Sequence, residues 1–128
     1  MKVPSDLITF WSLAGSAELF LDVAYGQWGL RMLSVYDAEN ETALAFGSRP
    51  TEFKLGDLVI GLFIGDSDIL IMRCDPSEND FGSLVVCNAI TRRTDWHHAA
   101  KSLSEFLVAY EAHGGDKFWE SSSSRLTD

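Results

Sequence analysis

The chain has 128 residues, of which 46% are hydrophobic and 12% aromatic, and its formal net charge at pH 7 is −9. This size and composition predict one globular domain whose core needs no metal or disulfide to hold it. The excess of acids argues against a nucleic acid or an anionic membrane as partner, because both present negative charge. It favours a basic protein as partner, although acidity also serves solubility alone.

The two cysteines, Cys74 and Cys87, each lie inside an apolar run and have no neighbours at metal-ligand spacing. We expect buried free thiols, while a disulfide between adjacent strands stays open. The first residues, MKVPSDLITFW, lack the hydrophobic region and cleavage site of a secretory signal. No apolar run approaches the ~20 residues of a membrane span. These features predict a cytoplasmic protein.

The first half of the chain predicts two helices and two strands. Apolar residues recur at helical spacing over residues 7–14, where Ser5 or Asp6 can cap the helix start. Strands are expected over residues 18–23 and 28–35, separated by a turn.

A second helix is predicted over residues 37–46, whose acidic front suits the positive end of a helix dipole. Asp37 can cap this helix and Gly47 can end it.

The middle of the chain contains its clearest structural signal. Residues 58–64 and 69–72 are apolar at almost every position, and the short acidic turn GDSD separates them. A strand with one wet face alternates apolar and polar residues, so these runs predict two central strands covered on both faces. A polar loop over residues 75–80 and a further strand over residues 84–90 follow.

The last part of the chain predicts a strand and a capped helix. Residues 96–100 fit a strand or a helix start, and the capping box formed by Ser102 and Glu105 favours the strand, with the helix beginning at Ser102. We therefore predict a single α+β domain over residues 1–120, with a mostly antiparallel central sheet of about five to six strands and helices packed against it. The polar tail, residues 121–128, is expected to be flexible.

Several landmarks together resemble the SUKH superfamily, the cell-wall-assembly-regulator-like family, and in particular its bacterial members. They are the segment Gly15-Ser16 before a strand, the aromatic–glycine turn YGQWGL at residues 25–30, the Gly65-Asp66 turn between apolar strands, Phe106-Leu107 in a capped helix, and Lys117-Phe118-Trp119-Glu120 after it. The chain departs from the family in its short first helix and in Phe118, where tyrosine is more usual.

The resemblance implies an α+β fold with a central sheet. For a bacterial member it also implies an immunity protein, which binds and neutralises a toxin, commonly a nuclease or a deaminase. Such a protein is not an enzyme and needs no cofactor, and its partner here would be a basic toxin domain. Eukaryotic relatives look like intracellular interaction hubs, so an interaction module without a toxin partner, or a small-ligand-binding protein, stays open.

Six acids in and beside the central hairpin are candidate toxin contacts: Asp57, Asp66, Asp68, Asp75, Glu78 and Asp80. Asp66 and Asp68 belong to the turn, whereas Asp57 and Asp75 lie at the open end of the hairpin, so the acids cannot form one patch. The alternative interpretation is that they are turn residues that keep loop ends wet. Trp28 is a further candidate contact, with packing on the sheet as its alternative.

The sequence offers little for catalysis or metal binding. Asp66 and Asp68 are too few for a calcium loop, which needs six or more oxygens. Adjacent residues on a strand face opposite ways, so His97 and His98 cannot serve one site. Ser67 and Ser83 have no recognisable base or oxyanion loop beside them. We therefore expect no metal site and no catalytic residues.

Overall fold

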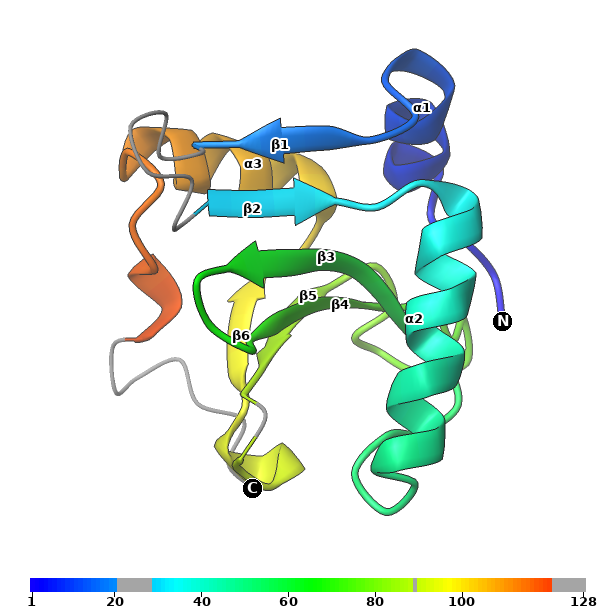
Figure 1. The fold of residues 1–128 in the computed structure, drawn as a ribbon. Coiled ribbons are helices and arrows are strands. Elements are labelled where there is room, and N and C mark those ends of the chain that lie inside the picture. Colours follow the sequence, from blue (N-terminus) through cyan, green and yellow to red (C-terminus); the bar gives the residue numbers. More distant parts are fainter. Residues whose placement is uncertain (21–28, 89, 121–128) are drawn as a thin grey trace.

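The computed structural model describes residues 1–20, 29–88 and 90–120. Its six strands form one antiparallel sheet in the order β1-β2-β3-β4-β5-β6, so each strand pairs with its neighbours in sequence (Figure 1). The strands are β1 (Ala17–Leu19), β2 (Gly29–Met32), β3 (Asp57–Ile64), β4 (Ile69–Arg73), β5 (Leu84–Cys87) and β6 (His97–Ala100). The predicted α+β class with an antiparallel sheet is confirmed.

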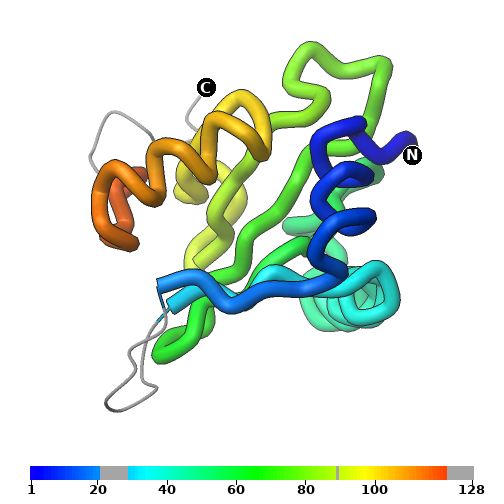
Figure 2. Tube along the Cα trace, turned by 90° about the horizontal axis from the view of Figure 1, so that it is seen from above, coloured from blue at the N-terminus to red at the C-terminus, as the bar shows by residue number. Residues whose placement is uncertain are grey.

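Helices cover both faces of this sheet. They are α1 (Ser5–Leu13), α2 (Val35–Ser48) and α3 (Leu103–Ala112), with 3-10 turns η1 (Arg93–Asp95) and η2 (Phe118–Glu120). α1 and α3 lie next to each other on one side of the sheet, and α2 lies on the other side (Figures 1 and 2). On the α2 side, the Thr42 hydroxyl of α2 accepts a 2.8 Å hydrogen bond from the Val59 amide of β3.

The two central strands are buried on both faces, as their apolar runs predict. On the side away from α2, the ring of Phe63 in β3 contacts Trp119 of η2, and Trp119 in turn contacts Phe106 and Tyr110 of α3. These aromatic contacts join the C-terminal part of the domain to the middle of the sheet. These rings belong to the hydrophobic core, and burying them removes much apolar surface from water.

A bulge interrupts the pairing of β3 with β4 between Val59 and Gly61. The extra residue reverses the alternation of side chains, so that Val59 before the bulge and Leu62 after it face the same side. Leu62 lies opposite Ile69, and Ile69 lies opposite Cys87, which sets a row of apolar side chains across the α2 face of the sheet.

The start of α2 differs from its prediction. The helix begins at Val35 rather than Asp37, because Ser34 has extended backbone angles and its hydroxyl accepts a hydrogen bond from the Asp37 amide. Asp37 therefore lies in the first turn, and Gly47 lies inside the helix instead of ending it. Ser34 and Asp37 are both residue types that favour the N-cap, and the structure uses the earlier one.

Other boundaries are also corrected. β5 ends at Cys87, short of the predicted residue 90, because the Asn88 side chain turns the chain by accepting a hydrogen bond from the Ile90 amide. β1 ends at Leu19, and the following Phe20 has a φ of 53°, which does not continue a strand. The predicted strand over residues 96–100 is confirmed as β6, and Ser102 caps α3 as predicted, its hydroxyl accepting from the Glu105 amide.

The predicted turn around residues 25–27, Trp28 and the predicted flexible tail of residues 121–128 lie outside the described residues. Nothing in the described structure bears on them.

Asp6 plays a different part from the one the sequence predicts. Neither Ser5 nor Asp6 is the N-cap of α1, because Pro4 holds that position. The Asp6 carboxylate instead accepts hydrogen bonds from the backbone amides of Leu103, at 2.9 Å, and Ser104, at 3.3 Å. It therefore caps the start of α3 from another helix, next to the positive end of that helix's dipole.

We predict that Asp6→Ala destabilises the domain by about 1 kcal/mol, the usual cost of losing a cap. Urea unfolding followed by circular dichroism measures this. Glu111→Ala, an exposed change in the last turn of α3, is the control and should leave the unfolding free energy nearly unchanged. Equal effects of the two substitutions would contradict the capping role.

Candidate functional site

The open end of the β3–β4 hairpin contains a buried charge cluster. The side chains of Asp57 and Arg73 are both 0% exposed, and the Arg73 Nη1 atom lies 2.7 Å from an Asp57 carboxylate oxygen. The other Asp57 oxygen accepts hydrogen bonds from Arg93 at 2.6 Å and from the Lys54 amide at 2.9 Å. Asp57 therefore has its charge matched inside the protein and offers no surface to a partner.

Arg73 also forms ion pairs with two acids of the loop between β4 and β5. Its guanidinium lies 2.9 Å from Glu78 and 3.1 Å from Asp80. Burial of Arg73 opposes its charge, but Asp57 and Asp80 outweigh that effect and raise the pKa of the guanidinium above its usual value. Three of the six candidate acids thus surround one cation and fasten the loop to the strand.

A glycine allows the chain to close tightly beside this cluster. Gly56 has a φ of 91°, and a Cβ built there would lie 2.7 Å from the Cβ of Asp75. Asp75 itself lies at the edge of the cluster, where its carboxylate accepts hydrogen bonds from the hydroxyl and the amide of Ser77. These hydrogen bonds lower the pKa of Asp75, which stays a charged, partly exposed group.

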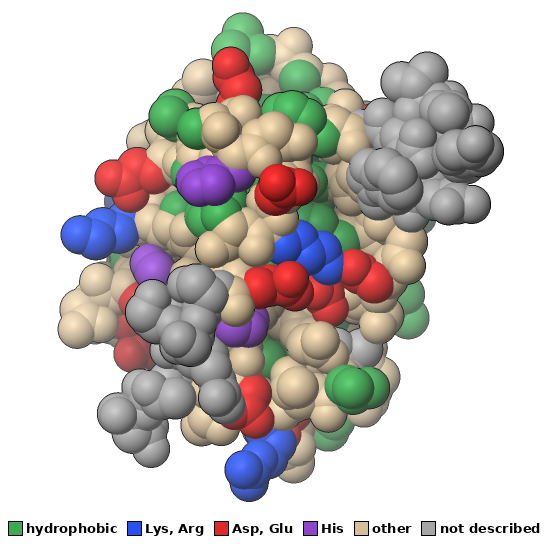
Figure 3. All heavy atoms as spheres, turned by 90° about the vertical axis from the view of Figure 1, so that its left-hand side faces the viewer, with side chains coloured by type: hydrophobic (Ala, Val, Ile, Leu, Met, Phe, Trp, Pro, Cys, Tyr) green, Lys and Arg blue, Asp and Glu red, His purple; other side chains and the backbone are tan. Residues whose placement is uncertain are grey.

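The turn at the other end of the hairpin holds the remaining two acids. Lys117, just before η2, forms ion pairs with both Asp66 and Asp68, the latter at 3.0 Å. Burial of Lys117 acts against its charge, but the hydrogen bonds to the two carboxylates outweigh this and raise its pKa. Acidic side chains predominate over basic ones on this side of the molecule, at the left of Figure 1 (Figure 3).

The structure therefore separates the candidate acids into the two groups expected from the hairpin. It adds that five of the six contact a basic side chain of the same chain, so most of their charge is matched internally. Asp66 is exposed in the turn, whereas Asp75 is half-buried at the open end of the hairpin and forms no ion pair among the described residues. Their contact with a partner stays a prediction, as does that of Trp28.

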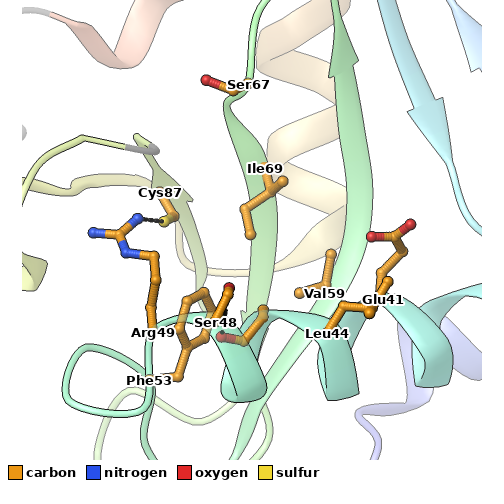
Figure 4. Close-up of a pocket in the computed structure, with 10 residues that line it drawn as sticks. Glu41, Leu44, Ser48, Arg49, Phe53, Val59, Ser67, Ile69 and Cys87 are labelled. Carbon is orange, nitrogen blue, oxygen red and sulfur yellow. Dashed lines mark hydrogen bonds between the residues drawn. The ribbon is translucent and has the colours of Figure 1, made fainter.

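A pocket beside α2 was not among the sequence predictions. It has a volume of about 310 Å³ and lies between α2 and the sheet, with side chains from both directed toward it (Figure 4). We call it the α2 groove; its lining residues are Glu41, Leu44, Ala45, Ser48, Arg49, Phe53, Val59, Ser67, Ile69 and Cys87. The lining is mainly apolar, and Arg49 and Glu41 lie on opposite sides of it (Figure 4).

Acidic side chains continue along α2 from the α2 groove. Asp37 and Glu41 are four residues apart and so lie on one face of the helix, one turn from each other. A second hollow of about 410 Å³ lies at the start of α2, where Asp37 faces Glu18 of β1 and Arg31 of β2. Neither Asp37 nor Glu41 forms an ion pair within the part of the chain that the structure describes. This surface is acidic at one end and apolar at the other.

The sequence does contain part of the signal for this surface. Asp37, Glu41 and Leu44 follow the spacing of one face of the helix predicted over residues 37–46, and Ser48 continues that face beyond its predicted end. Phe53 comes from the loop after α2 and Cys87 from β5, so only the fold brings these two to one groove.

The thiol in the α2 groove is not a candidate nucleophile. Burial raises the pKa of Cys87 to about 12, and the nearby Arg49 only partly opposes this. Burial likewise raises the pKa of Cys74 to about 12. Both cysteines are free and buried, as predicted, and both are protonated at neutral pH, where a thiol reacts poorly.

Within residues 1–20, 29–88 and 90–120, no three His, Cys, Asp or Glu side chains gather as they would around a metal ion. None of the helices in these ranges combines the length and the apolar character that crossing a bilayer requires.

Comparison of the chain with protein-family models, with curated proteins and with solved structures found no match. The SUKH resemblance therefore depends on the sequence landmarks alone and stays a prediction.

Removing the buried guanidinium of Arg73 should lower the free energy of unfolding substantially. We predict that Arg73→Met destabilises the domain by about 3 kcal/mol or more, because it leaves Asp57, Glu78 and Asp80 without their shared cation. Urea unfolding measures the loss. Lys54→Met removes only the exposed ion pair with Glu78, 3.2 Å long, and should cost about 1 kcal/mol or less. Similar losses for the two variants would contradict a structural role for the buried cluster.

The Lys117 ion pairs predict a pH dependence. The pKa of Lys117 is raised in the folded state. The stability that its ion pairs give the folded protein is therefore complete below the unfolded pKa of about 10.4 and is lost as pH rises through the folded pKa. We expect Lys117→Met to cost about 1 kcal/mol or less near pH 7, and progressively less as the pH rises through the folded pKa of Lys117. Unfolding free energies of both proteins across this range measure it, with Lys101→Met as the exposed control. A difference that grows with pH would refute the assignment.

Proposed function

We propose that this protein is an immunity protein that binds a basic toxin domain and neutralises it by occlusion, the toxin being of the nuclease or deaminase type. The SUKH resemblance carries the toxin part of the proposal. The observation that supports binding is the α2 surface, where the acids Glu18, Asp37 and Glu41 adjoin the apolar α2 groove.

Such a surface combines the two features that a protein interface needs. Acids without ion pairs among the described residues attract a basic partner from a distance and speed its capture. An apolar recess then gives an anchor residue of the partner a place to lose its contact with water. Leu44, which is 65% exposed at the rim of the groove, would be covered in such a complex.

The hairpin acids have a lesser part in the proposal. Asp57, Glu78 and Asp80 hold the fold together around Arg73, so we assign them to stability. Asp66 and Asp75 are accessible, and they can extend the contact at the ends of the hairpin. The proposal therefore puts the main contact on α2 rather than on the hairpin.

Two other functions stay possible for the same surface. An interaction module without a toxin partner would use it in the same way and would differ only in what it captures. A small-ligand-binding protein is favoured by the volume of the α2 groove, about 310 Å³, which is at the lower limit for ligand pockets. Both alternatives predict that co-expression with a toxin gives no protection.

The test is co-expression of the protein with the toxin domain encoded beside its gene. We expect restored growth, a complex on gel filtration, and binding that weakens as salt is raised. Asp37→Lys combined with Glu41→Lys should slow association about tenfold or more. The matched control, Glu111→Lys with Asp116→Lys, reverses two exposed acids at the far end of α3 and should have little effect. If the unaltered protein neither restores growth nor binds the toxin domain, the proposal fails.

A further inference from the structure

The α2 groove has opposite charges on its two sides, separated by an apolar floor. Among the described residues, Arg49 is the one cation of its lining and Glu41 the one carboxylate. Between them, Leu44, Val59 and Ile69 are directed toward the space that the two charged side chains border (Figure 4). A ligand that crosses the floor therefore meets a positive group at one end and a negative group at the other.

Arg49 is held in place by groups that do not neutralise it. Its Nη1 atom donates to the Asn88 carbonyl at 3.0 Å and lies 3.5 Å from the Cys87 sulfur. Its Nη2 atom donates to the Thr91 carbonyl, and the guanidinium lies 5.9 Å from the ring centre of Trp96. These partners are neutral, and among the described residues no carboxylate lies within ion-pair distance of Arg49. The cation is thus fixed in orientation, with its charge available to an anion.

Glu41 stands at the other side of the α2 groove in a different setting. It is half-buried on α2, one turn before the exposed Leu44 and one turn after Asp37. Beyond it, the second hollow holds two acids, Glu18 and Asp37, and one cation, Arg31, so acids outnumber bases on that side among the described residues. On the other side, Arg49 is the one cation that the described lining of the groove holds. The surface therefore suits more than one basic group on the acidic side and a single carboxylate on the other.

We infer that the α2 groove seats a short segment of the partner protein that carries, in order, basic residues, one or two large apolar residues and a carboxylate. This inference rests on the proposed function and names the chemistry of the partner's contact. A protein segment is favoured over a free small molecule because the acidic side continues past the groove to Glu18. Burial of Leu44 likewise needs an occupant that reaches over the rim.

The volume and the charges both limit what the segment can be. A space of about 310 Å³ has room for one or two apolar side chains but not for a packed helix. A segment with basic residues on both sides would place a cation against Arg49, and one with acids on both sides would place carboxylates against Glu41. Each mismatch leaves like charges together, which disfavours binding.

The experiment uses three capped octapeptides with the same central leucine–phenylalanine pair, flanked by glycines. The first has two lysines before the centre and two glutamates after it, the second has lysines on both sides, and the third has glutamates on both sides. Titration of the ¹⁵N-labelled protein, followed by NMR, measures each affinity and locates each site. We expect the first peptide to bind at least about threefold more tightly than either other peptide, with shifts at Val59, Ile69 and Cys87.

Variants then test the two ends of the site. Glu41→Lys should remove the preference for the first peptide over the all-glutamate peptide. Glu39→Lys, an equal charge change two residues earlier on α2, is the matched control and should retain it. Leu44→Asp should weaken the first peptide about tenfold. Val108→Asp, at a position that is 70% exposed on α3, should not.

The inference is overturned if no peptide binds at millimolar concentration, if all three bind equally, or if the shifts lie away from the α2 groove. These outcomes are separable from failure of the proposed function. A toxin domain that binds without losing affinity to Leu44→Asp would leave the immunity role standing and refute the groove as its contact. Selective peptide binding without any protection against the toxin would refute the immunity role and leave the α2 groove standing as a peptide site.

Discussion

The buried pairing of Asp57 with Arg73 is the constraint on which the rest of this domain depends. A lone charge in the core would be too costly to keep, so each of these residues requires the other and the groups around them. Arg73 forms ion pairs with Glu78 and Asp80, which hold the loop after β4 against the hairpin. Asp57 forms an ion pair with Arg93, which holds η1 there. The hairpin, the loop after β4 and η1 thereby meet at one end of the hairpin. At the opposite end, Lys117 forms ion pairs with the two acids of the turn.

This arrangement changes where a partner is expected to bind. An acidic chain has many carboxylates, but those that satisfy buried or half-buried cations contribute little to the field outside the protein. Here the acids in and beside the hairpin are largely neutralised from within. The acids of β1 and α2 have no such partners in the described structure. They adjoin the apolar recess that α2 leaves over Val59 and Ile69.

The parts of the fold that could be predicted are those whose signals are local. The unbroken apolar runs of β3 and β4 require burial on both faces, and the capping box at Ser102 marks its helix without ambiguity. Asp37 is itself a residue type that favours the N-cap, so the predicted start of α2 is wrong, and the structure has the cap three residues earlier, at Ser34. The pairing of Asp57 with Arg73 and the meeting of Phe53 with Cys87 in the α2 groove depend on contacts between distant residues, which composition and spacing do not reveal.

The cap that Asp6 gives to α3 has a consequence for synthesis of the protein. The antiparallel sheet forms from neighbours in sequence, so its strands can pair as they leave the ribosome. α1 is made first, yet the amide of Leu103 that its Asp6 binds follows 97 residues later. The nascent chain must therefore hold α1 without this contact until Leu103 has been made. Docking of α1 onto α3 then follows pairing of the strands that lie between them in the sequence.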